Sequence, residues 1–66
     1  MSRPEWAADL IGDMFRAGIK QIELADKLGV SREFLNRVLT GKQKAPSYAP
    51  ERYREAFDEI VAEREE

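Results

Sequence analysis

The sequence predicts an all-α fold, a compact four-helix domain, and three observations support this fold class. Gly and Pro residues divide the 66 residues into segments of helical length. Apolar side chains recur three and four residues apart within these segments. No stretch alternates strictly between apolar and polar residues over more than a few positions, so strands are not predicted. A chain of this length is expected to fold as a single domain, residues 1–66, with a thin core.

The first predicted helix begins near Ser2 and Glu5, whose spacing fits a capping box between side chains and backbone N–H groups. Pro4 falls in the first turn, where its missing N–H does no harm. Gly18 ends the helix. A wide apolar stripe is expected to face the core, and it comprises Trp6, Ala7, Leu10, Ile11, Met14 and Phe15.

Two short helices follow, over residues 21–28 and 32–40. Gly29 ends the first of them as a left-handed residue, and Ser31 is a good N-cap for the second. Gly41 ends the second helix. Their inner sides are expected to carry Leu24, Ala25, Leu28, Leu35, Val38 and Leu39. Phe34 lies near the outer side, where packing under the first helix is favoured over contact with a thymine methyl group.

The last predicted helix, over about residues 48–64, has the clearest amphipathic pattern in the chain, with apolar residues at i, i+3, i+4, i+7 and i+8. Part of this stripe is expected to cover the first helix. The distal part, from Ile60 onward, is expected to pair with a second copy in a homodimer. The predicted dimer interface comprises Tyr53, Phe57, Ile60, Val61 and Arg64. The alternative left open is that the monomer consumes the whole stripe, and Glu59 and Glu63 would repel across a close interface.

The charge of the chain is unevenly distributed, although its net value is only -2. Residues 16–44 hold seven bases and three acids, for +4, whereas residues 1–15 carry -2 and residues 45–66 carry -4. A basic middle can bind a polyanion on one face of the molecule. The alternative is that these charges are ordinary solvated surface.

Composition argues against an enzyme. The chain has no Cys and no His, so the commonest general base and the thiolate ligands of metals are missing. The core is too small for an ordinary ligand pocket. No cofactor, metal or small-molecule ligand is therefore expected. No apolar run could span a membrane and Glu5, Asp9 and Asp13 oppose a signal peptide, so a cytoplasmic location is expected.

Residues 21–40 have the spacing of a helix-turn-helix, in which the second helix enters the major groove of DNA. The small Ala25 lies where two helices cross closely, and Gly29 follows four residues later where the turn needs positive φ. The stretch 19–31, Ile-Lys-Gln-Ile-Glu-Leu-Ala-Asp-Lys-Leu-Gly-Val-Ser, resembles the phage-repressor and Cro-type helix-turn-helix family. The stretch 41–46, Gly-Lys-Gln-Lys-Ala-Pro, resembles the loop after the recognition helix in that family.

The resemblance covers roughly residues 8–62 and implies a lambda-repressor-like fold. Two departures stand out. Lys20 occupies the position where the family usually has Thr or Ser, so that N-cap is lost. The chain also has room for four helices, where many of these domains have a fifth.

The resemblance also implies which residues meet DNA. The residue matching the family's glutamine is Gln21, which would hydrogen-bond a phosphate and brace the recognition helix. The outward residues of that helix are expected to read base edges, and they are Arg32, Glu33, Asn36 and Arg37. Phosphate contacts are expected from Lys20, Thr40, Lys42, Gln43 and Lys44. For each group the alternative is a solvated polar surface.

The sequence therefore predicts a sequence-specific DNA-binding transcriptional regulator. The resemblance favours a repressor that occludes a promoter by inserting the helix 32–40 into the major groove. Its expected partner is double-stranded DNA with a palindromic operator, bound by a homodimer. The alternative is a protein-interaction module, in which the helix-turn-helix is a scaffold and the acidic face of the last helix binds another protein.

Overall fold

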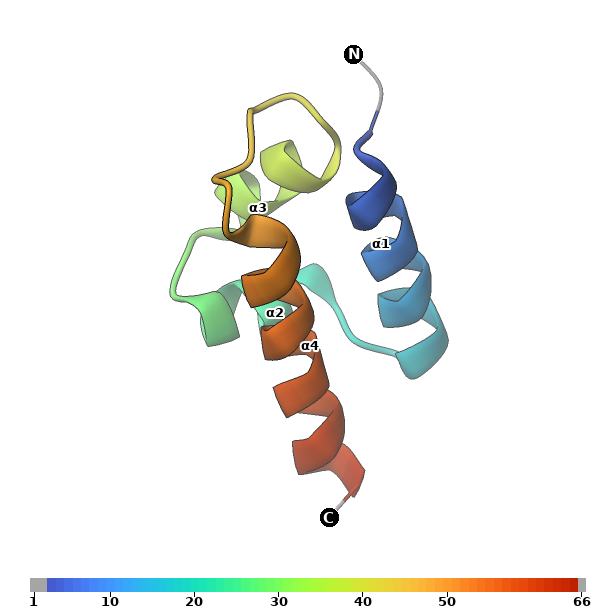
Figure 1. The fold of residues 1–66 in the computed structure, drawn as a ribbon. Helices are drawn as coiled ribbons and strands as arrows, with labels where there is room; N and C mark the ends of the chain where they lie inside the picture. The colour runs from blue at the N-terminus through green and yellow to red at the C-terminus, as the bar shows by residue number, and fades with distance from the viewer. Residues whose placement is uncertain (1–2, 66) are drawn as a thin grey trace.

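The computed structural model describes residues 3–65 and contains four helices, as predicted (Figure 1). They are α1 (Glu5–Ala17), α2 (Gln21–Leu28), α3 (Arg32–Leu39) and α4 (Ala49–Glu65). The helix α4 packs against α1 and α2, while α3 packs against α1 and α2. The described residues contain no strand, so the all-α fold class with a central helix-turn-helix is confirmed. None of these helices has an apolar stretch long enough to span a membrane.

The ends of α1 are set by backbone hydrogen bonds. Pro4 is the N-cap rather than a first-turn residue, since its backbone is extended (ψ 147°) and its carbonyl accepts from the N–H of Ala7 at 3.1 Å. The predicted capping box depends on Ser2, which lies outside the described residues. At the other end Gly18 has φ 71°, and the N–H of Ile19 donates to the carbonyl of Met14 at 2.9 Å. This left-handed glycine ends α1 where the sequence predicted.

The inner side of α1 is narrower than predicted. Leu10 and Met14 are buried, and Trp6 is partly buried against the same core. Phe15, however, is 87% exposed, so the expectation that it faces the core is wrong. Consecutive helical residues point about 100° apart. Leu10 and Met14 lie on the side of α1 that the other helices cover, and the ring of Phe15 falls outside that side.

The turn between the two middle helices is marked by two residues that the sequence singled out. Gly29 ends α2 and Ser31 begins α3. Gly29 has φ 75°, and the N–H of Val30 donates back to the carbonyl of Ala25 at 3.0 Å. The hydroxyl of Ser31 accepts from the backbone N–H of Phe34 at 3.1 Å, which confirms the predicted N-cap of α3. The ring of Phe34 packs partly buried against the core, as favoured from the sequence.

The helix α3 is one residue shorter than predicted. It ends at Leu39, and Thr40 is its C-cap, still with right-handed backbone angles. Gly41 then takes φ 83° and turns the chain into the following loop. The helix α4 begins at Ala49, within a residue of the predicted start, and ends at Glu65.

The core uses almost the whole apolar stripe of α4. The ring of Tyr53 meets Trp6 of α1 edge to face, with centroids 5.7 Å apart. Tyr53 is 3% exposed, and Phe57 and Ile60 are each 8% exposed. Val61 is partly buried against the same cluster. These side chains belong to the core of the monomer, so Tyr53, Phe57 and Ile60 of the predicted dimer interface leave little free surface for a second copy.

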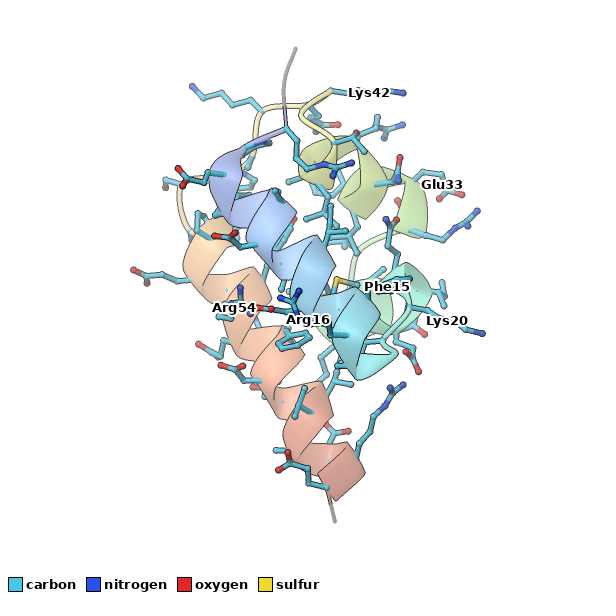
Figure 2. The ribbon with its side chains drawn as sticks, turned by 90° about the vertical axis from the view of Figure 1, so that its right-hand side faces the viewer. Phe15, Arg16, Lys20, Glu33, Lys42 and Arg54 are labelled. Atoms are coloured by element: carbon cyan, nitrogen blue, oxygen red, sulfur yellow. The ribbon has the colours of Figure 1, made fainter. Side chains whose placement is uncertain are left out.

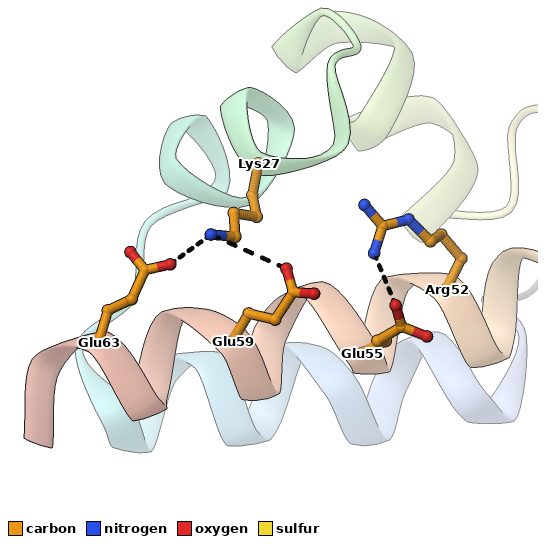
Figure 3. Close-up of polar contacts among 5 residues, drawn as sticks. All are labelled: Lys27, Arg52, Glu55, Glu59 and Glu63. Carbon is orange, nitrogen blue, oxygen red and sulfur yellow. Dashed lines mark hydrogen bonds and ion pairs between the residues drawn. The ribbon is translucent and has the colours of Figure 1, made fainter.

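The acidic outer side of α4 is partly neutralised by basic side chains. The ammonium group of Lys27 on α2 pairs with Glu63 and lies 3.8 Å from a carboxylate oxygen of Glu59 (Figure 3). One turn after the start of α4, Arg52 pairs with Glu55 at 3.2 Å. The first of these contacts joins α4 to the helix-turn-helix.

A second ionic contact joins α4 to α1. Arg54 donates to a carboxylate oxygen of Asp13 at 2.7 Å, and Arg16 pairs with the other oxygen of that carboxylate (Figure 2). The hydrogen bond from Arg54, followed by the one from Arg16, holds the pKa of Asp13 below its ordinary value of 3.8. Arg54 also lies over the ring of Phe57, 5.4 Å from its centroid. The Asp13 carboxylate is therefore charged at neutral pH.

Candidate functional site

The helix α3 divides cleanly into an inner and an outer side. Its inner side chains, Leu35, Val38 and Leu39, are fully buried. Four polar side chains predicted to read bases are exposed on the outer side, and they are Arg32, Glu33, Asn36 and Arg37. These four line one shallow groove together with Gln21 of α2. The structure thus brings together the predicted base-reading residues and the predicted phosphate ligand.

The first residue of α2 is coupled directly to α3. The side-chain amide of Asn36 donates to the Oε1 atom of Gln21 at 3.2 Å. This bond uses the oxygen of the Gln21 amide, so its NH₂ group is the part that can donate to an anion. The N-terminus of a helix is also a favourable place for an anion, because its backbone N–H groups and dipole are positive. Gln21 can therefore bind a phosphate while it holds Asn36 in place.

The loop after α3 folds back onto the end of that helix. The backbone N–H groups of Lys42 and Gln43 donate to the carbonyl of Arg37 at 2.9 and 3.1 Å. The Nε atom of Arg37 in turn donates to Oε1 of Gln43 at 3.2 Å. Lys42, Gln43 and Lys44 are exposed. The loop thereby extends the outer side of α3 with two further ammonium groups.

Thr40, which was predicted to donate to phosphate, makes its hydrogen bonds within α3 in this structure. Its hydroxyl group donates to the carbonyl of Asn36 at 2.8 Å, and its backbone N–H donates to the same carbonyl at 2.9 Å. Both donors of Thr40 are therefore used at the end of α3. In this conformation the side chain caps the helix.

The exposed charges around α3 are predominantly positive. Glu33 is the acid of the outer side of α3, where Arg32 and Arg37 flank it. Lys20, Glu33 and Lys42 extend from the same side of the molecule (Figure 2). Two other bases of the basic middle, Arg16 and Lys27, pair with acids on α1 and α4. An open polar groove with this charge suits an extended polyanion better than a small apolar ligand.

Glu23 is a polar side chain at the start of α2 that sequence reasoning missed, and it faces the hollow between α2 and α4. Its Oε2 atom accepts from the backbone N–H of Lys20 at 2.7 Å, at the start of α2. This contact is half of a capping box, and a Glu three residues after the cap position is the signal that could have revealed it. The hydrogen bond from Lys20, together with one from Arg64, holds the pKa of Glu23 below its ordinary value of 4.5. A charged carboxylate therefore lies at the N-terminus of α2.

Residues 3–65 contain no group of three or more His, Cys, Asp or Glu side chains placed to hold a metal ion. The dimer residue Arg64 also has a different environment from the one predicted. Its guanidinium contacts Glu23 and the carbonyl of Gly18 within the same chain. The polar side chains of α2 and α3 that are predicted to bind DNA converge on one open groove. A separate polar hollow lies between α2 and α4, and its lining includes Glu23, Lys27 and Arg64.

Comparison with known proteins gives one finding on this surface. A family model described as helix-turn-helix (HTH_3) matches residues 16–49, which is just over half of the chain. The matched residues include α2, α3, the loop that follows and the first residue of α4. No curated protein and no solved structure matches the chain significantly.

Proposed function

The chain belongs to the helix-turn-helix family of the Cro/C1 type, and from this premise we propose that it is a sequence-specific transcriptional regulator that inserts α3 into the major groove. Membership of the family implies DNA binding. The observation that supports base reading is the outer side of α3, where Arg32, Glu33, Asn36 and Arg37 are exposed. Arg matches the guanine edge, Asn the adenine edge, and Glu can accept from cytosine.

Phosphate contacts would set the position of α3 in the groove. Lys20 and Gln21 lie at the start of α2, and Lys42, Gln43 and Lys44 lie in the loop after α3. Lys20 and Lys42 lie toward opposite ends of one side of the molecule, with Glu33 between them (Figure 2). Contacts to two stretches of backbone fix the register of a helix between them. Thr40 is left out of this set because its donors are used within α3.

Repression is the regulatory mode that we propose, through a bound protein that occludes a promoter. The family resemblance favours this mode, and we propose no catalytic activity. A reporter gene tests repression when the DNA sequence that the protein binds is placed in its promoter. Expression of the reporter should fall when the protein is present. A rise in expression would instead identify an activator.

We also propose that two copies bind a palindromic operator. Two-fold symmetry would place two α3 helices at half-sites about 10–10.5 base pairs apart. The contact between copies must use side chains other than Tyr53, Phe57 and Ile60, which the monomer buries. Sedimentation of the protein with and without operator DNA measures the number of copies. A single half-site bound by one copy would contradict the dimer.

The decisive experiment is a selection from random double-stranded DNA with the full chain. We expect enrichment of a defined sequence, with two inverted half-sites if the protein binds as a dimer. The competing function is a protein-interaction module that uses the acidic side of α4. That function predicts no retention on DNA even at low salt, and such a result would exclude the proposed regulator.

A further inference from the structure

Arg64, in the last turn of α4, reaches across to the connection between α1 and α2. Its Nη1 atom donates to the carbonyl of Gly18 at 3.0 Å, and its Nη2 atom pairs with Glu23. Gly18 is the C-cap of α1 and Glu23 lies in the first turn of α2. One guanidinium therefore bridges the two ends of the connection, over residues 18–20.

The same contact controls the charge at the start of α2. The carboxylate of Glu23 accepts from the backbone N–H of Lys20 at 2.7 Å, so it occupies the positive N-terminus of the helix. Gln21, the proposed phosphate ligand, is the first residue of that helix. An uncompensated carboxylate there would repel a DNA phosphate, whereas a neighbouring guanidinium cancels its charge.

We propose that Arg64 is a positioning residue for phosphate binding by α2, because it neutralises Glu23 and fixes the connection that carries Lys20 and Gln21. The inference rests on the proposed function, since the phosphate belongs to the DNA backbone. It gives the end of α4 a part in DNA binding, although α4 lies outside the helix-turn-helix. This role within the chain is separate from the dimer contact predicted for Arg64.

Lys27 provides a matched control on the neighbouring face. It too joins α2 to α4, through Glu59 and Glu63, but it lies in the last turn of α2 instead of the first (Figure 3). Lys27→Gln removes one positive charge and the ionic contacts that it makes between the two helices, as Arg64→Gln does. The two variants differ in whether the N-terminus of α2 loses its compensating charge.

The test is a double-mutant cycle measured as affinity of the full chain for a short DNA duplex of mixed sequence at low salt. We expect Arg64→Gln to weaken binding about two- to fivefold, the size of one half-exposed charge interaction. Glu23→Gln should bind at least as tightly as the wild type. The double variant Glu23→Gln, Arg64→Gln should recover to within about twofold of the wild type, since no carboxylate then needs compensation. Lys27→Gln should weaken binding less than Arg64→Gln.

Each arm has an outcome that overturns the inference, and for Lys27→Gln it is a loss of affinity as large as that of Arg64→Gln. A double variant that binds no better than Arg64→Gln would show that neutralisation of Glu23 plays no part, and would overturn the inference. Glu23→Gln binding more weakly than the wild type would do the same, and thermal unfolding of every variant checks that the protein is folded during the measurement. Wild-type protein that does not bind DNA contradicts the proposed function. Wild-type binding that Arg64→Gln leaves unchanged contradicts only this inference.

Discussion

At the scale of single residues, Arg37 joins the outer side of α3 to the loop that follows it. Its Nε atom donates to Gln43 and its carbonyl accepts from the backbone of Lys42 and Gln43. The two terminal NH₂ groups of its guanidinium can then point outward as a pair. This is the arrangement in which an arginine donates to both O6 and N7 of a guanine.

Arg37→Ala should therefore lower sequence-specific affinity by about 1–3 kcal/mol and relax the preference at one base pair in each half-site. Lys44→Ala, in the exposed loop, should weaken binding to all sequences alike, because a phosphate carries no sequence information. Titration of both variants against the selected operator and an unrelated duplex measures the difference. The same loss on both duplexes for Arg37→Ala would remove it from the base-reading set.

Asp13 should make stability depend on pH in the acid range. Its hydrogen bonds from Arg54 and Arg16 lower its pKa in the folded chain below the ordinary 3.8. The carboxylate therefore stabilises the fold above its unfolded pKa, and this contribution disappears as the pH falls through the lower folded value. Asp13→Asn should be less stable than the wild type at neutral pH and should lose less stability on acidification. Urea unfolding across that range measures both, with Asp9→Asn on the same helix as control.

At the scale of elements, the turn between α2 and α3 is limited by backbone conformation rather than by space. Gly29 has φ +75°, yet a Cβ atom there would meet nothing within 4 Å. Gly12, in the middle of α1, has no positive φ, so its backbone accepts other residues. A Cβ atom there would make an ordinary contact of 3.6 Å with the end of the flexible Arg16 side chain.

Gly29→Val should accordingly destabilise the fold by about 1–2 kcal/mol, the cost of a left-handed L-residue, and β-branching adds to it. Gly12→Ala should stabilise the fold by up to about 1 kcal/mol, because alanine favours a helix interior. Chemical denaturation of the two variants gives both numbers. Equal stability of Gly29→Val and the wild type would mean that the turn does not need positive φ.

The elements themselves were largely predictable, because their signals are local. The sequence predicted α2 at its observed bounds, Gln21–Leu28. Its C-terminal end is marked locally by Gly29, the residue that follows the helix. Two misjudged positions depend on distant parts of the chain. Phe15 lies in an apolar pattern but outside the packed face. Arg64 finds Glu23, 41 residues earlier, and no local pattern encodes that pairing.

In the candidate site, too, local features could be predicted from the sequence, whereas contacts between elements could not. The outward set on α3 followed from helical spacing, and the structure places all four side chains along one groove. The link from Asn36 to Gln21 and the one from Arg37 to Gln43 could not be read from spacing. Such bonds depend on how two elements meet. The bond from Thr40 to its own helix could not be read from the sequence either, because a hydroxyl group can bond its own helix as well as a ligand.

At the scale of the whole molecule, α4 supplies much of a thin core. Ile60 is 8% exposed and packs among the side chains that join α4 to the other helices. Ile60→Asp should therefore unfold the protein, because the carboxylate would replace a buried apolar side chain of the core, which is strongly unfavourable. Circular dichroism at low temperature measures this. A folded Ile60→Asp variant that sediments as a monomer would instead return Ile60 to a dimer contact.

The dependence of binding on salt reports the number of phosphates that the assembly covers. Lys20 and Lys42 extend from the same side of the molecule as Glu33 of α3, and Lys44 is exposed in the loop after that helix. Each neutralised phosphate adds about -0.9 to the slope of log affinity against log salt, so one copy should give about -3 and two copies about -5. Titrations at several salt concentrations distinguish the two. An affinity independent of salt would contradict binding through phosphates.

The separation of α3 into a buried and an exposed side affects how the DNA specificity of such a protein can evolve. Leu35, Val38 and Leu39 maintain the fold, while the four outward positions contribute no buried side chain. Substitutions at the outward positions alter the chemistry offered to a partner at little cost in stability. New operator preferences are therefore accessible through folded intermediates. A library randomised at those four codons would yield mostly folded proteins, which makes this small chain a practical starting point for engineered regulators.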